Sequence, residues 1–254
     1  GGAICIEGKS GTVDNSYFED NSAASAGAIY LKGSSNIVKN SNFTDNQVTM
    51  YGGAIYIEGN GNEVLTSTFT DNTADENGGA IYIKGDSNKV ITDNFINNVA
   101  TLNGNAIWVE SGAANNISRS KFEGVKHVYV NAGSSAILRE NEELSSIDSE
   151  YAVYNKGTLS LYTNEFNNII YNDGVIDTQT YANISCNTTY YNWTEWSFPA
   201  HAYIWDDNNN SVISVRFTYA TYVNGVKQED TPASDNLTHN ASISVKQFDY
   251  LLGA

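Results

Sequence analysis

The chain has 254 residues, a formal charge of −16 and only 13 lysines and arginines. So acidic a chain argues against nucleic acid and anionic membranes as partners, because both are bound through basic side chains. No apolar run approaches the roughly 20 residues of a membrane-spanning helix, so we expect no membrane insertion in this segment. The length leaves room for a substantial core and for two domains.

A repeat of 25 or 26 residues occupies the first half of the chain. The alanine that opens its Ala-Ile segment recurs at Ala3, Ala28, Ala54, Ala80 and Ala106. Apolar residues alternate with polar ones in each copy, and Gly, Asn, Asp and Ser separate the short apolar segments, which is typical of strands and turns. One such unit cannot bury its apolar face alone, so successive units must stack. The sequence therefore predicts an all-β fold, a right-handed parallel β-helix with coils about 4.8 Å apart.

Equivalent positions in successive copies predict the stacking. Ile29, Ile55 and Ile81 should share one interior, followed in each copy by a valine and a phenylalanine five residues apart. A charged row should alternate in sign, and opposite charges on adjacent strands stabilise the register; its members are Glu7, Lys32, Glu58, Lys84 and Glu110. An asparagine three residues after each phenylalanine predicts a ladder of amide hydrogen bonds; its members are Asn21, Asn46, Asn72 and Asn98.

The regular coils are expected to end near residue 122, with irregular and shorter coils up to residue 184. Two similar segments beginning at Tyr154 and Tyr171 lie 17 residues apart and indicate narrower coils. Residues 185–200 are rich in aromatic side chains and predict a junction. Residues 201–254 contain short apolar runs separated by hairpin signals, which predict a small immunoglobulin-like β-sandwich that is short for that fold.

One outward row of the predicted helix is aromatic. Its members are Tyr30, Tyr56, Tyr82 and Trp108. A flat aromatic strip can stack on sugar rings or on another protein, so this row is the candidate ligand-binding site. Replacing Tyr56 and Tyr82 by serine is then expected to abolish adhesion and to leave thermal stability almost unchanged. The alternative is that loops cover the row, or that it stacks on itself and stiffens the sheet.

Three acidic residues occupy equivalent turns. Asp20, Asp45 and Asp71 each precede a ladder asparagine and should lie one coil apart. Such stacked carboxylates can be solvated turn residues, a Ca²⁺ site or the carboxylate pair of a retaining glycosidase. Calcium is the one cofactor that the sequence suggests, and no residue is assigned a catalytic role.

Several Asn-x-Ser/Thr motifs suggest an exported and glycosylated surface. The candidate glycosylation sites are Asn116, Asn183, Asn187, Asn192, Asn209, Asn236 and Asn240.

The repeat resembles a known family. The Gly-Gly-Ala-Ile segments at 52–55 and 78–81, with the Phe-x-x-Asn segments, resemble the repeats of chlamydial polymorphic outer-membrane proteins. The Asn- and Tyr-rich coils, followed by the segments Asp-Asp-Asn-Asn-Asn (206–210) and Tyr-Val-Asn-Gly-Val (222–226), are similar to adhesin-like surface proteins of methanogenic archaea, in which immunoglobulin-like modules follow a β-helix. The resemblance implies an extracellular, cell-surface location and attachment to other cells.

These observations favour a non-catalytic adhesin module that binds cell-surface glycans or proteins of another cell. Two alternatives stay open. One is a structural subunit of an extracellular fibre, assembled end to end or by strand exchange. The other is a polysaccharide lyase or hydrolase, because parallel β-helices also carry such enzymes.

Overall fold

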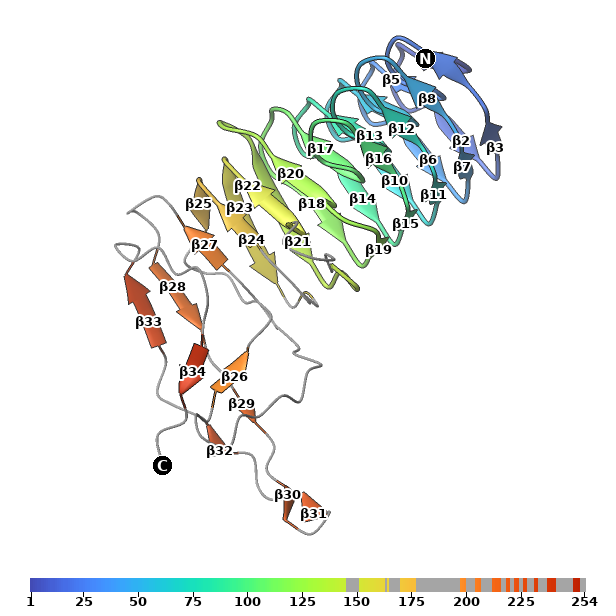
Figure 1. The fold of residues 1–254 in the computed structure, drawn as a ribbon. Helices are drawn as coiled ribbons and strands as arrows, with labels where there is room; N and C mark the ends of the chain where they lie inside the picture. The colour runs from blue at the N-terminus through green and yellow to red at the C-terminus, as the bar shows by residue number, and fades with distance from the viewer. Residues whose placement is uncertain are drawn as a thin grey trace.

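The computed structural model describes residues 1–144, 151–162, 164 and 170–176, together with the backbone of short strands between residues 197 and 251. The described part is all-β, and its principal feature is a parallel β-solenoid (Figure 1). Each coil passes through successive strands, and each strand pairs in parallel with its equivalent in the next coil. No described helix is long and apolar enough to cross a membrane.

Four sheets run along the solenoid. The first sheet contains β1 (Ile4–Ile6), β5 (Ile29–Leu31), β9 (Ile55–Ile57), β13 (Ile81–Ile83), β17 (Ile107–Val109), β20 (Val128–Val130), β22 (Val153–Asn155), β24 (Ile170–Asn172) and β27 (Ile204–Asp206). The second contains β2 (Thr12–Asp14), β6 (Ile37–Lys39), β10 (Glu63–Leu65), β14 (Lys89–Ile91), β18 (Asn115–Ser118), β21 (Ser135–Arg139), β23 (Thr158–Tyr162) and β25 (Val175–Ile176).

The other two sheets accompany only the regular coils. The third contains β3 (Tyr17–Glu19), β7 (Asn42–Thr44), β11 (Thr68–Thr70), β15 (Asn94–Ile96) and β19 (Lys121–Glu123). The fourth contains β4 (Ser22–Ala23), β8 (Gln47–Val48), β12 (Thr73–Ala74) and β16 (Val99–Ala100). In the described residues after Glu123 the chain adds strands only to the first two sheets, and the third continues through a single bridge between Lys121 and Glu142, so the coils become narrower.

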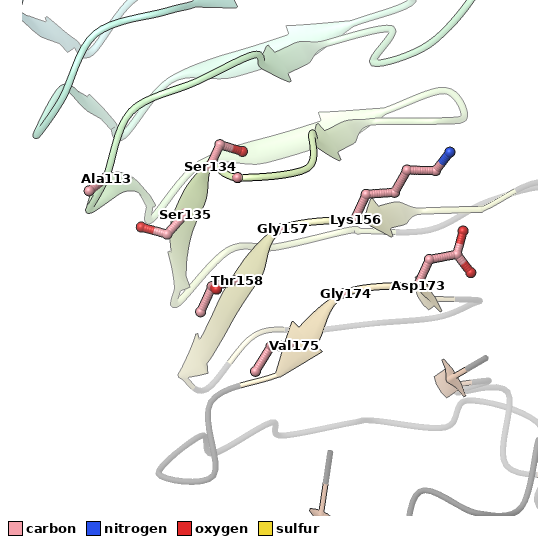
Figure 2. A pocket seen from close by; sticks show the side chains of 10 residues that line it. Ala113, Ser134, Ser135, Lys156, Gly157, Thr158, Asp173, Gly174 and Val175 are labelled. Atoms are coloured by element: carbon pink, nitrogen blue, oxygen red, sulfur yellow. The ribbon is translucent and has the colours of Figure 1, made fainter. Parts of the chain in front are cut away.

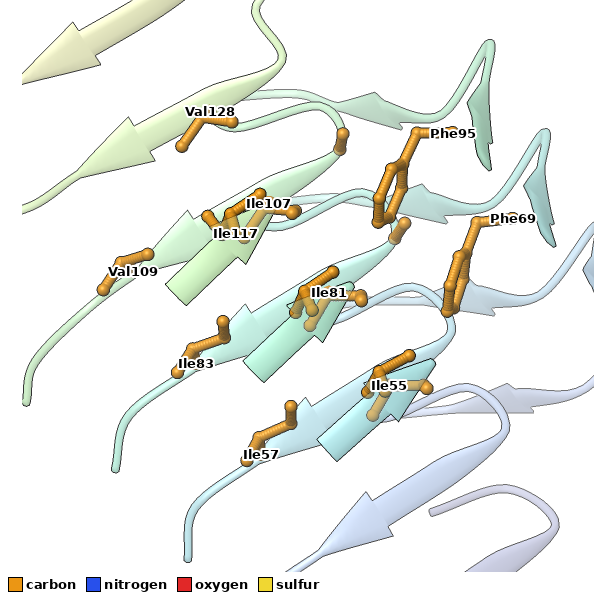
Figure 3. Packing of buried hydrophobic residues seen from close by; sticks show 14 of the residues in the cluster. Ile55, Ile57, Phe69, Ile81, Ile83, Phe95, Ile107, Val109, Ile117 and Val128 are labelled. Carbon is orange, nitrogen blue, oxygen red and sulfur yellow. The ribbon is translucent and has the colours of Figure 1, made fainter. Parts of the chain in front are cut away.

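The core consists of columns of identical or similar side chains (Figure 3). Ile29, Ile55 and Ile81 are fully buried and pair in register from coil to coil, which confirms the predicted shared interior. The phenylalanines stack face to face, with ring centroids 4.8 Å apart between Phe43 and Phe69 and an interplanar angle of 4°. This spacing follows from the separation of adjacent strands.

The predicted asparagine ladder is present. The Asn46 side-chain amide donates to Asn72 Oδ1 at 2.8 Å, and Asn72 donates in the same way to Asn98 at 2.9 Å. Each amide also donates to the carbonyl of a phenylalanine in the preceding coil, for example Asn72 to Phe43 at 3.0 Å. The buried turn therefore satisfies its polar groups without water.

Two more polar ladders, which the sequence reading did not predict, line the other turns. In one, asparagines donate from coil to coil, for example Asn36 to Asn62 at 3.1 Å. In the other, a buried hydroxyl accepts the backbone N–H of the preceding coil, as Ser67 Oγ does from Ser41 at 3.2 Å. The second ladder has an aspartate, Asp93, at the position where the neighbouring coils have serine.

The paired glycines of the repeat have two different roles. Gly52 has a φ of +68°, a left-handed conformation that L side chains rarely adopt. Gly53 lies against the next coil, where an added Cβ would come within 1.9 Å of the Gly79 carbonyl oxygen. The equivalent of Gly52 in the second copy is Ala26, with a φ of +56°, so the first position tolerates alanine.

Beyond residue 184 most of the chain lies outside the described residues. The described strands there form four antiparallel pairs: β26 (Ser197–Pro199) with β34 (Asp249–Leu251), β28 (Val212–Val215) with β33 (Leu237–Asn240), β29 (Thr218–Tyr219) with β32 (Thr231–Pro232), and β30 (Tyr222–Val223) with β31 (Val226–Lys227). β27 instead pairs in parallel with β24 and extends the first sheet. The junction at 185–200 and the immunoglobulin-like domain at 201–254 stay predictions.

Candidate functional site

The outward face of the first sheet carries a continuous aromatic row. Each strand of this sheet has three residues, and the outer two point into the core, so the middle residue points outwards. The row contains Tyr30, Tyr56, Tyr82 and Trp108, as predicted, and continues through Tyr129, Tyr154 and Tyr171. Ring centroids lie 5.0 Å apart between Tyr30 and Tyr56 and 4.1 Å apart between Trp108 and Tyr129. We call this row the aromatic face.

Much of the aromatic face is covered. Tyr82 and Trp108 are only 5% and 6% exposed, and they form a second apolar cluster outside the solenoid. Tyr51 comes from the loop before β9, and its ring lies 4.7 Å from the ring of Tyr82. The expected flat and open strip is therefore wrong at Tyr82 and Trp108, and only Tyr30 and Tyr56 of the predicted set are partly accessible.

Carboxylates accompany the aromatic rings. Glu58 accepts a hydrogen bond from the Tyr30 hydroxyl. Glu110 accepts hydrogen bonds from the indole N–H of Trp108 at 2.7 Å and from the Asn131 side-chain amide at 3.1 Å. The face thus combines aromatic surface with acceptors, the two kinds of group that bind a hydroxylated or an amphipathic ligand.

The same arrangement keeps the phenols protonated. Burial, together with the negative charges of Glu58 and Glu110, raises the pKa of Tyr56 to about 12. Burial is the main cause that raises the pKa of Tyr30, and the hydrogen bond to Glu58 raises it further. Burial, with Glu110 nearby, also raises the pKa of Tyr82. These hydroxyls therefore act as hydrogen-bond donors or acceptors at neutral pH and carry no charge.

The alternating charge row is only partly formed as ion pairs. Lys32 Nζ lies 3.0 Å from Glu7 and Lys84 Nζ lies 3.9 Å from Glu58. Among the described residues no ion pair joins Lys84 to Glu110, because the Glu110 carboxylate is turned towards Trp108. A second charged row, which the sequence reading missed, lies on the second sheet and includes Lys89 and Glu63 at 2.7 Å.

The stacked aspartates occupy turn positions that require a left-handed backbone conformation. Asp20, Asp45 and Asp71 are exposed, and their φ angles are +54°, +53° and +55°. Asp and Asn tolerate this left-handed conformation better than other L residues, which explains why Asn97 is the fourth member, with a φ of +51°. In the described part of the chain no three His, Cys, Asp or Glu side chains are grouped so that they could hold a metal ion.

The candidate glycosylation sites fall almost entirely outside the described residues. This applies to Asn183, Asn187, Asn192, Asn209 and Asn236, and for Asn240 only its place at the end of β33 is described. Asn116 lies in β18 and is partly buried. Glycosylation stays a prediction.

The aromatic residues outside the regular copies were not predicted as part of this row. Tyr129, Tyr154 and Tyr171 join the aromatic face although the spacing between them is no longer 26 residues. The two similar segments that begin at Tyr154 and Tyr171 contained this signal, because each tyrosine precedes the same Asn-x-Gly turn. Tyr51 precedes β9 and stands in register with Asn77 and Asn103 of the next two copies, so no recurring aromatic residue marks its position. Tyr151 precedes β22, outside the regular copies.

Comparison with known proteins gives one match. Residues 40–58 and 66–84 are similar to the Chlamydia polymorphic membrane protein repeat. Each stretch runs from a stacked phenylalanine and its ladder asparagine to the glycine pair and the following strand of the first sheet, so the shared residues are those that build the coil. Searches of curated proteins and of solved structures find no match. The likeness to archaeal adhesin-like proteins stays a prediction.

Proposed function

We propose that this chain is a non-catalytic, extracellular cell-surface module that attaches its cell to glycans or proteins of another cell. The similarity to repeats of a polymorphic membrane protein supports a surface location. The stacked ladders support a rigid scaffold, because each coil is fixed to its neighbours by backbone and side-chain hydrogen bonds.

The observation that carries the proposal is the aromatic face. Tyr30 and Tyr56 lie side by side, partly accessible, with the Glu58 carboxylate at hydrogen-bonding distance from Tyr30. Aromatic residues next to hydrogen-bonding groups are frequent at recognition surfaces, because they offer a large contact area at a small loss of conformational entropy. The buried Tyr82 ring packs against Tyr56 from one side, with ring centroids 4.9 Å apart, and holds this ring in place.

The test compares two tyrosine surfaces of the same chain. The double variant Tyr30→Ser with Tyr56→Ser removes the accessible rings, and Tyr17→Ser is its control, because Tyr17 is 60% exposed on the third sheet. Cells and a glycan array are the probes, and a cooperative thermal transition shows that each variant is folded. We expect the double variant to lose attachment while Tyr17→Ser retains it. Equal attachment by both would remove the aromatic face from this role.

The same preparations test the two alternatives. Filaments of the purified chain in electron micrographs would favour the fibre subunit. Breakdown of a glycan that disappears in the double variant Asp45→Asn with Asp71→Asn would favour the carbohydrate-active enzyme.

A further inference from the structure

The solenoid has a groove at the corner between its first and second sheets. In the regular coils this corner is long, for example residues 58–62 between β9 and β10. It shortens to residues 131–134 between β20 and β21, and then to residues 156–157 and 173–174 in the following coils. The step from long to short corners leaves a hollow of about 580 Å³ on the surface.

Glycines keep the floor of this groove bare. An added Cβ on Gly157 would come within 2.3 Å of the Ser134 carbonyl oxygen, and one on Gly174 within 2.2 Å of the Gly157 carbonyl oxygen. The short corners must therefore be glycine because they lie directly on the preceding coil. The two corners therefore carry no side chain at residues 157 and 174, where they line the groove (Figure 2).

One wall of the groove is charged. Lys156 and Asp173 follow β22 and β24 directly and continue the charged row of the regular coils. Asp173 accepts a hydrogen bond from the Tyr154 hydroxyl, and Lys156 Nζ lies 5.5 Å from the centroid of the Tyr154 ring. This wall thus offers an ammonium group and a carboxylate beside an aromatic ring.

The opposite wall carries hydroxyl and methyl groups. Ser135, Thr158 and Val175 pair in register at the start of β21, β23 and β25 (Figure 2). Thr158 is exposed, and Val175 is 45% exposed although it is apolar. Two hydroxyl groups and a small apolar patch therefore follow one another at the separation of adjacent strands, about 4.8 Å.

We infer that this groove binds a neutral saccharide. Sugar hydroxyls are both donors and acceptors, so they match Lys156, Asp173 and Thr158 together, whereas a purely anionic or cationic ligand would meet one like charge. The net charge of −16 further disfavours a polyanionic glycan. The volume of the groove is in the range of small-ligand sites. This site is separate from Tyr30 and Tyr56, so it does not depend on the function proposed for them.

The test uses isothermal titration of the chain with neutral tetrasaccharides of glucose, galactose or mannose, and with a tetragalacturonate as the acidic probe. Thr158→Tyr fills the groove. Its control is Thr12→Tyr, the same change at an exposed position of the second sheet in the first coil. Lys156→Ala is a second variant, which removes an exposed donor without adding bulk.

We expect at least one neutral tetrasaccharide to bind, with an affinity that falls about tenfold or more in Thr158→Tyr and in Lys156→Ala and is unchanged in Thr12→Tyr. Three results would overturn the inference: no binding of any neutral probe, binding of tetragalacturonate alone, or equal binding by Thr158→Tyr and Thr12→Tyr. Attachment of cells through Tyr30 and Tyr56 is measured separately and can fail or succeed independently.

Discussion

Asp93 Oδ1 accepts the backbone N–H of Ser67 at 2.6 Å, in the place where the neighbouring coils use a serine hydroxyl. The other oxygen, Oδ2, is buried and has no partner within the described part of the chain. Burial raises the pKa of the Asp93 carboxyl well above its ordinary value. At pH values between the ordinary carboxyl pKa and this raised one, the folded protein therefore keeps a proton that the unfolded chain releases.

Asp93→Ser is expected to stabilise the protein at neutral pH. The raised folded-state pKa means that the contribution of Asp93 to the free energy of unfolding is greatest below about pH 4 and falls as pH rises towards the folded-state pKa. A serine hydroxyl restores the ladder and removes the unsatisfied oxygen, which is worth about 1–3 kcal/mol. Urea unfolding at pH 4 and pH 7 measures the free energy of unfolding of both proteins. The gain in stability from Asp93→Ser should be larger at pH 7. An equal gain in stability at both pH values would contradict the raised pKa of the Asp93 carboxyl.

Asn72→Ala is expected to destabilise the solenoid by about 2–4 kcal/mol. The change leaves the Asn46 amide and the backbone N–H of Asn46 without their acceptor, and the Phe43 carbonyl without its donor, all in a dry interior. Asn42→Ala is the control, because Asn42 is exposed on the neighbouring strand. Thermal unfolding compares the two, and similar midpoints would mean that the ladder contributes little.

Replacing Gly52 or Gly53, the two glycines of one pair, by alanine is expected to lower stability by different amounts. Gly52→Ala introduces a left-handed alanine, which costs about 1–2 kcal/mol. Its Cβ would also lie within 2.5 Å of the Ile55 carbonyl oxygen of the same coil, but the second copy accommodates alanine at this place, as Ala26. Gly53→Ala places a methyl group against the Gly79 carbonyl and forces two coils apart, so its loss of stability should be larger. Denaturant midpoints compare the stability of the two variants. A lower midpoint for Gly52→Ala than for Gly53→Ala would disprove the roles assigned to the two glycines.

The buried phenols are expected to limit stability at high pH. Because folding raises the pKa of Tyr56 to about 12, the folded state keeps a proton that the unfolded chain loses near pH 10, and stability falls between these values. Absorbance of tyrosinate follows the titration. Tyr82→Phe removes one such proton and keeps the ring, so the loss between pH 10 and pH 12 should become smaller, whereas Tyr82→Ser should destabilise at every pH because Tyr82 is buried. An unchanged slope in Tyr82→Phe would contradict the argument.

The columns could be predicted because their members recur at a constant spacing. Ile55 and Ile81, or Asn46 and Asn72, occupy identical places in successive copies, and stacking is the only way for such units to bury an apolar face. The aromatic face was predicted as a row for the same reason. Its coverage could not be predicted, because Tyr51 has no aromatic counterpart in the next two copies, where Asn77 and Asn103 stand, so no aromatic column marks it.

The groove was also beyond sequence reasoning. It depends on where the corner shortens relative to the preceding coil, and thus on the close approach of Gly157 to Ser134 and of Gly174 to Gly157. The chemical character of its walls follows from this register and from no single motif.

The alternation of charge along the column has a consequence for how such a chain can change its length. Loss of residues 52–77 by recombination would leave every interior column intact and shorten the stack by one strand separation, about 4.8 Å. It would, however, bring Lys32 next to Lys84, two like charges on adjacent strands. Loss or gain of two coils at once keeps acid beside base, so genetic variation in the length of this solenoid is expected to proceed in pairs of repeats.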